Sequence, residues 1–567
     1  MRQVGLRLGL LIALALNASA PSLQPQEAEK AQQAPGAPAQ DAAKPQPPAA
    51  AQTQTQTVTC TVDTSPKPLS APLADALHLY RTGKFDAAAA AYNAIAASGG
   101  SDAVLAYTGL ARVYLKQNKP SDAFDAASNA VGLTPGKTPA ITALGEVYFR
   151  QGKLQQAEQL FLKPLQDCDA DARSYLGLSR IDRATSDYNR AKSAVIRAYN
   201  LDPDDPEIGR AYIATLSPSE LKVLRENLGR EPNEEARNRD TLERKMALFE
   251  RESGQPVHTC HPTSKVTATQ TALEAMFDGP RRIRGYGLTV KVNGASARLL
   301  LDTGADGIVI DQKIADKAGV RKVVEHDSKG IGDKAAAAGY IGFADSIEIG
   351  DLQFEGCYVD VLDRNSVMDD DGLIGADVFS SYLVDIDFPD TKFKLTQLAP
   401  YPDEAPAETT LESRPSPSSH LHDRYIAPEM KGYTPIFRFG HALLIPTKVN
   451  DSAPMLFLID TGSFDNTITP AAAKQVTKIS REENFKVKGI NGEVKDIYRA
   501  DKANLQFAHF KQDRQDLVTF NLDNISNSMG TELSGILGFR MLRLLDIKID
   551  YRDGLVDFIY TPPGSSR

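Results

Sequence analysis

The tripeptide Asp-Thr-Gly occurs twice in this chain, at Asp302–Gly304 and at Asp460–Gly462. Each copy ends an apolar run that returns from a turn, at Asn293-Gly294 in the first copy and at Asn450-Asp451 in the second. Such turns between apolar runs are typical of β-hairpins. The chain must therefore fold the same strand–turn–strand unit twice, which restricts its fold more than any other feature of the sequence.

The residues after the two tripeptides match as well. A glycine-bearing segment begins 28 residues after the first Asp (330 − 302) and 29 after the second (489 − 460). An apolar-apolar-Gly triplet follows, with its Gly 73 residues after the first Asp (375 − 302) and 78 after the second (538 − 460). In both halves an apolar-Asp-aromatic triplet is centred 12 residues further on (387 − 375 and 550 − 538). Four features in one order with near-equal spacing indicate an internal duplication.

The duplicated region has the texture of an all-β fold. Beyond about Arg281, short β-branched and apolar runs are broken by Gly, Asn and Asp. A stretch rich in Pro, Ser and Glu, from residue 398 to about 420, divides this region in two. We therefore expect one β lobe at 281–397, a linker at 398–430 and a second lobe at 431–563.

With Leu300-Leu301 and Leu458-Ile459 directly before the two tripeptides, each unit resembles a retropepsin-like aspartic protease unit. In that family two units form one active site and each supplies one Asp, either as two chains in the viral enzymes or as two lobes of one chain in pepsin-like enzymes. The resemblance covers roughly residues 285–397 and 436–561. It implies two β-barrel lobes that pair within one chain, which would be active as a monomeric pseudo-dimer; the alternative is that each lobe pairs with a lobe of another chain.

The resemblance also implies roles for single residues. The catalytic pair would be Asp302 and Asp460. Two carboxylates about 3 Å apart cannot both ionise, so they share a proton; one activates a water and the other acts as the acid. This chemistry needs no metal, cofactor or covalent intermediate. Active-site support would come from Thr303, Gly304, Thr461 and Gly462. A peptide or protein substrate would be contacted by Ala305, Asp306 and Ser463, and by flap tips that contain Gly330, Gly332, Gly489 and Gly492.

The two units differ from each other and from the viral pattern. Viral retropepsins carry an Arg just after the apolar-apolar-Gly triplet, where this chain has Ala376-Asp377 in the first unit and Phe539-Arg540 in the second. Asp306 of the first unit also corresponds to Phe464 of the second. These differences predict an asymmetric substrate preference.

Not every paired aspartate is a catalytic candidate. Asp387 and Asp550 follow no glycine-bearing turn, so we interpret them as structural or exposed. A single Asp-Thr-Gly would be an ordinary turn, and only the duplicated context favours catalysis.

Residues 69–204 repeat with a period of 34. Leucines, alanines and tyrosines recur together at this spacing: Leu110, Leu144 and Leu178; Ala123, Ala157 and Ala191; Tyr114 and Tyr148. This pattern resembles the tetratricopeptide repeat, a helical hairpin that stacks into a solenoid. Small residues at Ala111 and Gly145 would let paired helices pack closely. We count about four hairpins and expect their concave face to bind a substrate or a protein partner, or else to act only as a spacer.

A capping-box start at Ser217–Glu220 and charged sequence to about Glu252 predict a helical connector, which we assign to residues 205–280. The predicted fold class is thus an all-α tetratricopeptide-type helical solenoid followed by an all-β bilobal aspartic protease.

The N-terminus has the features of a secretory signal. Arg2 and Arg7 precede the apolar run Leu8–Leu16, which is too short to span a bilayer, and Ala18–Ala20 is a small-residue cleavage site. Residues 21–68 are rich in Gln, Ala and Pro and predict a disordered linker. We expect an exported chain, periplasmic or secreted, with no membrane span after cleavage.

Four cysteines, Cys60, Cys168, Cys260 and Cys357, allow three disulfide pairings, and the sequence does not choose among them. The sequence His258-Thr259-Cys260-His261 matches no structural zinc spacing and is interpreted as a loop or as half of a disulfide.

The net charge, the histidines and the absence of one motif argue against two other functions. The net charge of −9 argues against a nucleic-acid surface, which needs a basic patch. The eight histidines are scattered and no Gly-x-Ser-x-Gly is present, which argues against a serine hydrolase. Two hypotheses remain: an exported endopeptidase whose repeats recruit a substrate or partner, and a non-enzymatic scaffold whose protease-like lobes bind peptides without cutting them.

Overall fold

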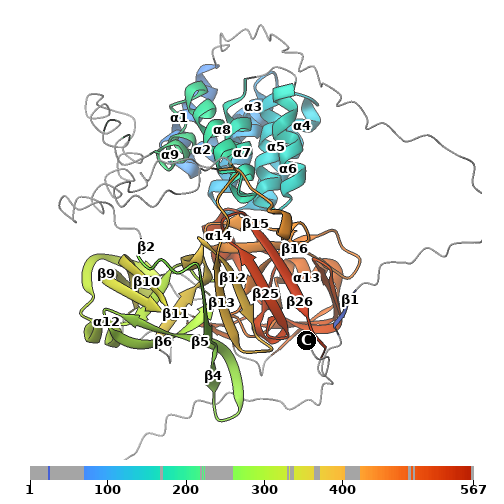
Figure 1. Ribbon diagram of the computed structural model, residues 1–567. Helices are drawn as coiled ribbons and strands as arrows, with labels where there is room; N and C mark the ends of the chain where they lie inside the picture. Colours follow the sequence, from blue (N-terminus) through green and yellow to red (C-terminus); the bar gives the residue numbers. More distant parts are fainter. Residues whose placement is uncertain are drawn as a thin grey trace, which may run out of the picture.

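The computed structural model describes residues 23–25, 69–166, 170–216, 220, 223, 260–328, 331, 337–362, 371–402, 422–482, 487–489 and 492–562. The predicted signal and most of its linker, most of the predicted connector and the centre of the first flap lie outside this part of the chain. Figure 1 shows a helical domain above two β lobes, the first green and yellow and the second orange and red. This order of a helical repeat and a strand-rich region confirms the predicted fold class.

Within the described residues, the helical domain contains four consecutive helical hairpins and a ninth helix. Their bounds are α1 (Ala71–Arg81), α2 (Phe85–Ser98), α3 (Ala103–Lys116), α4 (Pro120–Leu133), α5 (Thr138–Arg150), α6 (Leu154–Gln166), α7 (Ala172–Ala184), α8 (Tyr188–Leu201) and α9 (Pro206–Ile213). Glycines allow close contact between neighbouring helices. A Cβ on Gly145 would lie 2.7 Å from the ring of Phe161, so the missing side chain leaves the space that this ring fills.

An ionic network joins the first helices of the hairpins to α9. Arg112, Glu146 and Arg180 occupy the same repeat position, 34 residues apart, on α3, α5 and α7. Glu207 at the start of α9 pairs with Lys116, Arg173 and Arg180, and its carboxylate also accepts from the hydroxyl of Tyr80 on α1. Burial alone would raise the pKa of Glu207, but these cations hold it well below its usual range. The carboxylate of Glu207 on α9 therefore forms ion pairs with cations of both α3 and α7.

In the part of the chain that the structure describes, each β lobe is built on one nine-stranded sheet. Lobe 1 contains β2 (His261–Pro262), β4 (Glu274–Asp278), β5 (Arg282–Val292), β6 (Ala295–Asp302), β7 (Ile308–Asp311), β8 (Arg321–Ser328), β9 (Ala337–Ile349), β10 (Leu352–Leu362) and β11 (Gly372–Gly375), with helix α12 (Gln312–Ala318) after β7. Lobe 2 contains β15 (Phe437–Phe439), β16 (Ala442–Val449), β17 (Met455–Asp460), β18 (Thr467–Ile468), β19 (Ile479–Arg481), β22 (Tyr498–Phe507), β23 (Phe510–Thr519) and β24 (Gly535–Gly538), with helices α13 (Pro470–Val476), α14 (Asp523–Met529) and α15 (Phe539–Leu542). Its ninth strand is β1 (Leu23–Pro25), from the N-terminal part of the chain.

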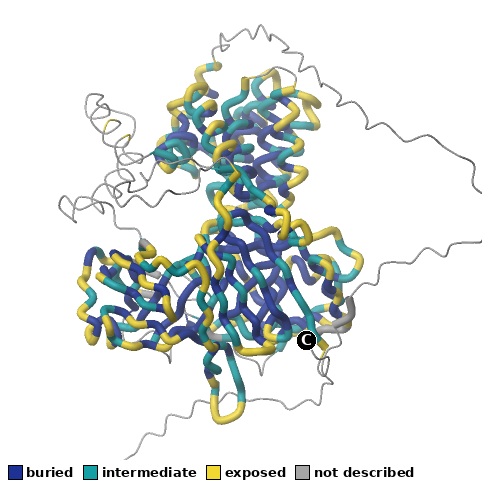
Figure 2. The backbone as a smooth tube through the Cα atoms, viewed as in Figure 1, coloured by how far each residue is buried: buried dark blue, intermediate teal, exposed yellow. Residues whose placement is uncertain are grey.

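The two lobes repeat one topology. In lobe 1 the short strand β11 runs parallel to β6 and antiparallel to β7, with Gly375 opposite Asp302. In lobe 2 β24 runs parallel to β17 and antiparallel to β18, with Gly538 opposite Asp460. Alternate residues of these strands are buried in one apolar core that spans both lobes, which Figure 2 shows as dark blue tube through the sheets. Each Asp-Thr-Gly therefore begins at the end of a strand that is held on both sides.

A six-stranded sheet joins the lobes. Its order is β14 (Thr434–Pro435), β26 (Leu555–Tyr560), β25 (Leu545–Asp550), β12 (Tyr382–Asp387), β13 (Lys392–Gln397) and β3 (Ala268–Ala272). Strand β12 of lobe 1 pairs antiparallel with β25 of lobe 2. Asp387 and Asp550 lie in these strands and both are buried, where they accept backbone N–H groups from Asp390 and Asp553. The structure therefore places them as structural residues, and the alternative that they are exposed was wrong.

Three segments differ from the predicted domain limits. Residues 261–278 form strands β2, β3 and β4, where a helical connector was expected. Their β-branched residues, such as Thr269 and Thr271, favour a strand, and β3 completes the interlobe sheet beside β13. Residues 422–430, assigned to the linker, include the buried Ala427 and Met430 and a short helix at Pro428–Met430. Leu23–Pro25, assigned to a disordered spacer, pairs as strand β1 with β23.

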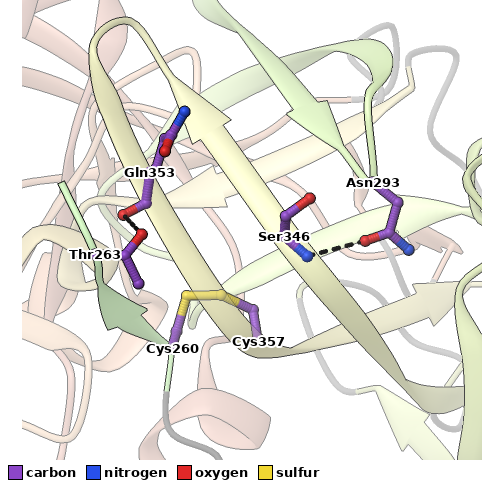
Figure 3. The surroundings of a disulfide bond; sticks show 6 residues. All are labelled: Cys260, Thr263, Asn293, Ser346, Gln353 and Cys357. Carbon is purple, nitrogen blue, oxygen red and sulfur yellow. Dashed lines mark hydrogen bonds between the residues drawn. A yellow bond between two sulfur atoms is a disulfide. The ribbon is translucent and has the colours of Figure 1, made fainter.

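One disulfide joins Cys260 to Cys357, with 1.99 Å between the two sulfur atoms. Figure 3 shows that it ties the residue before β2 to strand β10, beside the hydrogen bond from the Ser346 amide to Asn293. The structure thus selects one pairing and assigns Cys260 to the disulfide alternative that the sequence left open. Cys60 and Cys168 lie outside the described residues.

Candidate active site

Asp302 and Asp460 lie at the ends of two equivalent strands, β6 and β17. In each turn the glycine N–H donates to the aspartate two residues earlier, at 2.8 Å from Gly304 to Asp302 and 2.9 Å from Gly462 to Asp460. The amide of Ser463 adds a bond of 3.0 Å to Asp460. These bonds fix each carboxyl against its own turn, so the orientation of the side chain is set by the backbone.

The two carboxyls face each other across the lobes. A Cβ on Gly304 would lie 2.6 Å from the carboxyl carbon of Asp460, and a Cβ on Gly462 would lie closer still to the carboxyl of Asp302. Each glycine therefore lies against the aspartate of the other lobe, and only a residue without a side chain leaves room for that approach.

The protonation of the pair follows from this geometry. Burial, the charge of Asp460 and the hydrogen bond between the two side chains raise the pKa of Asp302 well above its usual range. Burial also raises the pKa of Asp460, while the hydrogen bond from Asp302 lowers it. Two carboxyls that share a hydrogen bond titrate as a unit and retain one proton over a wide range of pH. The pair can therefore offer an acid and a base at the same time.

Thr303 and Thr461 bind the two turns to each other. The hydroxyl of Thr303 donates to the carbonyl of Ile459 at 2.8 Å and accepts from the amide of Thr461 at 3.1 Å. The hydroxyl of Thr461 donates to the carbonyl of Leu301 at 2.8 Å and accepts from the amide of Thr303 at 3.0 Å. Both threonines are buried. Four hydrogen bonds without access to water thus hold the aspartates in register.

Replacing Thr461 by Val is expected to destabilise the paired lobes by about 2–4 kcal/mol, because it leaves a buried N–H and a buried carbonyl without a partner. Val has nearly the shape of Thr, so the loss reports the hydrogen bonds. Differential scanning calorimetry should show a lower Tm for the lobe transition. Thr82→Val, on an exposed turn, is the control and should cost less than about 0.5 kcal/mol. Equal Tm values for the two variants would contradict the bridging role.

The surroundings of the two turns are not symmetric. In lobe 1 the carboxylate of Asp377 accepts the amide of Gly307 at 3.1 Å. Burial and the neighbouring carboxyl of Asp306 raise the pKa of Asp377 to about 7. The imidazole of His441, from lobe 2, lies 3.8 Å from the exposed carboxylate of Asp306. Lobe 1 therefore places a second pair of acidic groups beside its Asp-Thr-Gly turn.

Lobe 2 has basic and aromatic groups at the matching place. Arg540 pairs with Asp465 at 3.5 Å, and Arg282 from lobe 1 lies 4.1 Å above the ring of Phe464. The sequence marked Asp377, Arg540 and Phe464 as departures from the viral pattern. It gave no indication that His441 and Arg282 reach across to the other lobe, because both precede their motifs by about twenty residues and meet them only through the pairing of the lobes.

The flap of lobe 2 is a short hairpin of β20 (Val487–Gly489) and β21 (Gly492–Val494), with Gly489 opposite Gly492. Gly492 has a φ of 91°, a left-handed conformation that favours glycine. A Cβ on Gly489 would lie 2.8 Å from the Cβ of Ile331, so the described tip of the first flap touches the second. Gly330 and Gly332 of the first flap lie outside the described residues.

The described residues hold no group of three or more His, Cys, Asp or Glu side chains arranged for a metal ion. Cys260 of the His-Thr-Cys-His sequence is consumed by the disulfide, and His258 is outside the described residues. Within the described part of the chain, no helix is long and apolar enough to cross a membrane.

Known family models match both the helical domain and the two β lobes. Residues 288–378 and 445–541 each match a family model described as aspartyl protease. Residues 73–138 match a tetratricopeptide repeat model. The chain therefore carries tetratricopeptide repeats followed by two aspartyl protease-like units.

Individual relatives are distant. The DNA damage-inducible protein 1 of Neurospora crassa is 29% identical over 170 residues, which make up 29% of this chain. The match spans 38% of the length of that protein. The crystal structure of a thermophilic TPR protein in Thermus thermophilus is 22% identical, with a TM-score of 0.27, and the match covers 31% of this chain and 97% of that one.

Proposed function

We propose that this chain, with its two aspartyl protease-like units, is an exported endopeptidase that hydrolyses peptide bonds with a water activated by Asp302 and Asp460. The observation that carries the proposal is the hydrogen-bonded carboxyl pair, in which each aspartate lies against the glycine of the opposite lobe. One carboxyl alone could not supply a base and an acid in the same step.

The chemistry follows from the shared proton. The ionised carboxylate takes a proton from water while the protonated carboxyl donates its proton to the oxygen of the scissile carbonyl. The resulting tetrahedral diol collapses when one carboxyl donates its proton to the leaving nitrogen and the C–N bond breaks. The other carboxylate takes a proton from a diol hydroxyl, so the pair again holds one proton. Because the proton belongs to the pair, neither aspartate holds a fixed role before substrate binds. Water is the nucleophile, so no covalent intermediate forms.

The substrate would lie extended between the flaps and the two turns. An extended peptide can pair with exposed backbone, and side-chain pockets then set preference. Ala305, Asp306 and Ser463 follow the catalytic turns and are assigned to substrate contact, together with Gly489 and Gly492 of the hairpin flap. The acidic Asp306 side and the aromatic Phe464 side would favour different residues at the two ends of the peptide.

Export and recruitment are part of the same proposal. The Cys260–Cys357 disulfide fits an oxidising compartment, which the apolar N-terminal run also favours. The repeats would bring substrate or a partner to the lobes. The cations of Lys116, Arg173 and Arg180 are already paired with Glu207, so an incoming ligand would use other surfaces of the repeats or displace α9.

Hydrolysis of an unstructured protein such as casein by the purified full chain tests this function. A statine-type mimic of the tetrahedral diol should abolish cleavage, because its hydroxyl occupies the place of the attacking water between the carboxyls. A chelator such as EDTA should leave the rate unchanged. Cleavage that resists the mimic but stops with EDTA would contradict the aspartate mechanism, and binding of the mimic without any cleavage would favour a silent peptide-binding scaffold.

A further inference from the structure

We propose that the repeat domain helps to position Asp460 for catalysis. Gly152, in the turn between α5 and α6, is the residue through which the repeat domain holds β17 and β24, the two strands that end at Asp460 and Gly538. The inference rests on the proposed peptidase function. It assigns the repeats a role in catalysis that does not depend on any partner bound to them.

Backbone groups at the end of α5 bind the segment that leads into β24. The carbonyl of Phe149 accepts from the hydroxyl of Thr531 at 2.8 Å, and the carbonyl of Arg150 accepts from the amide of Glu532 at 2.7 Å. The guanidinium of Arg150 also donates to the side chain of Asn527 on α14. The last carbonyls of a helix have no partner within the helix. The Phe149 carbonyl also accepts from the Gly152 amide, so lobe 2 adds a second bond there and supplies the bond to the Arg150 carbonyl.

The same segment reaches Asp460 within a few residues. The amide of Ser534 donates to the carbonyl of Leu456 on β17 at 2.9 Å. β24 then runs parallel to β17 until Gly538 lies opposite Asp460. The turn of α5 thus contacts both strands whose ends form this half of the site, one directly at Leu456 and the other through Thr531 and Glu532.

Apolar side chains continue this contact. Phe149, Leu154 and Phe161 of the repeats belong to one buried cluster with Leu456, Leu458 and Ile536 of lobe 2, and Val487 and Val494 of its flap pack against the same cluster. The rings of Phe149 and Phe439 lie 6.1 Å apart. Leu458 is two residues before Asp460. Figure 2 shows buried backbone on both sides of this junction.

In lobe 1 the equivalent strand is covered by residues of lobe 1 itself, without the repeat domain. Its counterpart of Leu456, four residues before the Asp, is the exposed Arg298, whereas Leu456 is buried. Its counterpart of Leu458 is Leu300, which clusters with Met276 from strand β4 of the same lobe. Lobe 2 has the short β15 in place of β4, and the repeat domain packs against the same face. The duplicated lobes are therefore not equivalent, because the Asp460 lobe is the one that packs against the helices at this position.

Gly152 lies directly against lobe 2. It has a φ of 73°, and a Cβ at this residue would lie 3.1 Å from the carbonyl oxygen of Glu532 and 3.2 Å from the side chain of Leu456. Asn118 occupies the same position one repeat earlier, with a φ of 55°, so this turn accepts Asn where lobe 2 is not packed against it. Gly136, also in the repeats, has a φ of 90° and nothing within 4 Å of a Cβ.

The test compares Gly152→Asn and Gly152→Ala with Gly136→Ala in the full chain. Kinetics are measured well below the Tm of each variant. Both Gly152 variants should lose about tenfold or more in kcat with KM within about twofold, since a small misplacement of a catalytic group lowers the rate of the chemical step. Gly136→Ala, which carries only the backbone strain, should keep wild-type kcat. A kcat in Gly152→Asn equal to that of the wild type would overturn the proposal.

Hydrogen exchange separates this inference from the peptidase function. In both Gly152 variants the amides of residues 533–538 should exchange at least about tenfold faster than in wild type and Gly136→Ala, because opening of that segment becomes easier. Unchanged exchange would overturn the positioning role even in an active enzyme. Faster exchange in a chain that cleaves no peptide would refute the peptidase function and leave the mechanical link between the repeats and β24 in place.

Discussion

Replacing Asp302 or Asp460 by Asn should lower kcat for peptide hydrolysis by at least about 10³-fold, because one carboxyl cannot act as base and acid together. Asn has nearly the same shape as Asp and can accept the same backbone N–H groups, so the fold should survive. The pair carries one negative charge in the wild type and also after either substitution, so the Tm of either variant should lie close to that of the wild type.

The matched control is Asp75→Asn, at an exposed site on α1, which should keep kcat within about twofold of wild type. Initial rates on a fluorogenic peptide and calorimetry on the same samples give both quantities. Substantial turnover in both active-site variants would contradict the assignment of the pair. Loss of turnover in one variant only would show that the two lobes do not contribute equally.

Gly462→Ala is expected to lower kcat by about 10²-fold, because its new methyl group would collide with the carboxyl of Asp302 and force the two aspartates apart. Gly462 does not have a left-handed backbone, so alanine adds no strain of its own. The effect therefore reports the space between the carboxyls.

Gly432→Ala is the matched control, since Gly432 also lacks a left-handed φ and has nothing within 4 Å of a Cβ. It should leave kcat unchanged. The same kcat in Gly462→Ala as in wild type would mean that the carboxyls are further apart in solution than in the structure, and the shared proton would then have no basis.

The helical domain shows what a sequence can reveal about a fold. Residues 34 apart meet equivalent neighbours in a repeat, so the period of Leu110, Leu144 and Leu178 predicts stacked hairpins without knowledge of distant contacts. The start of the β region was harder to predict from the sequence. Residues 261–278 form strands only because β13, β10 and β5 offer them edges, and such long-range pairing leaves a weak local signal.

Some features of the candidate site could likewise be predicted from the sequence, and others could not. Local sequence identified the two Asp-Thr-Gly turns, and the duplication indicated that they belong together. It could not predict the contact of Gly152 with Leu456, because the two residues are separated by some 300 positions and the repeats and lobe 2 each look complete alone. The sequence also could not predict the Cys260–Cys357 disulfide, because four cysteines allow three pairings until the fold brings two of them together.

The pairing of both lobes within one chain is tested most directly by mixing purified Asp302→Asn and Asp460→Asn chains and measuring peptide cleavage. If Asp302 and Asp460 of the same chain form the pair, no mixture contains an intact pair, and the rate should stay at that of either variant alone. Recovery of a substantial share of wild-type activity on mixing would show that the lobes pair between chains, and would contradict the structure on which this account depends.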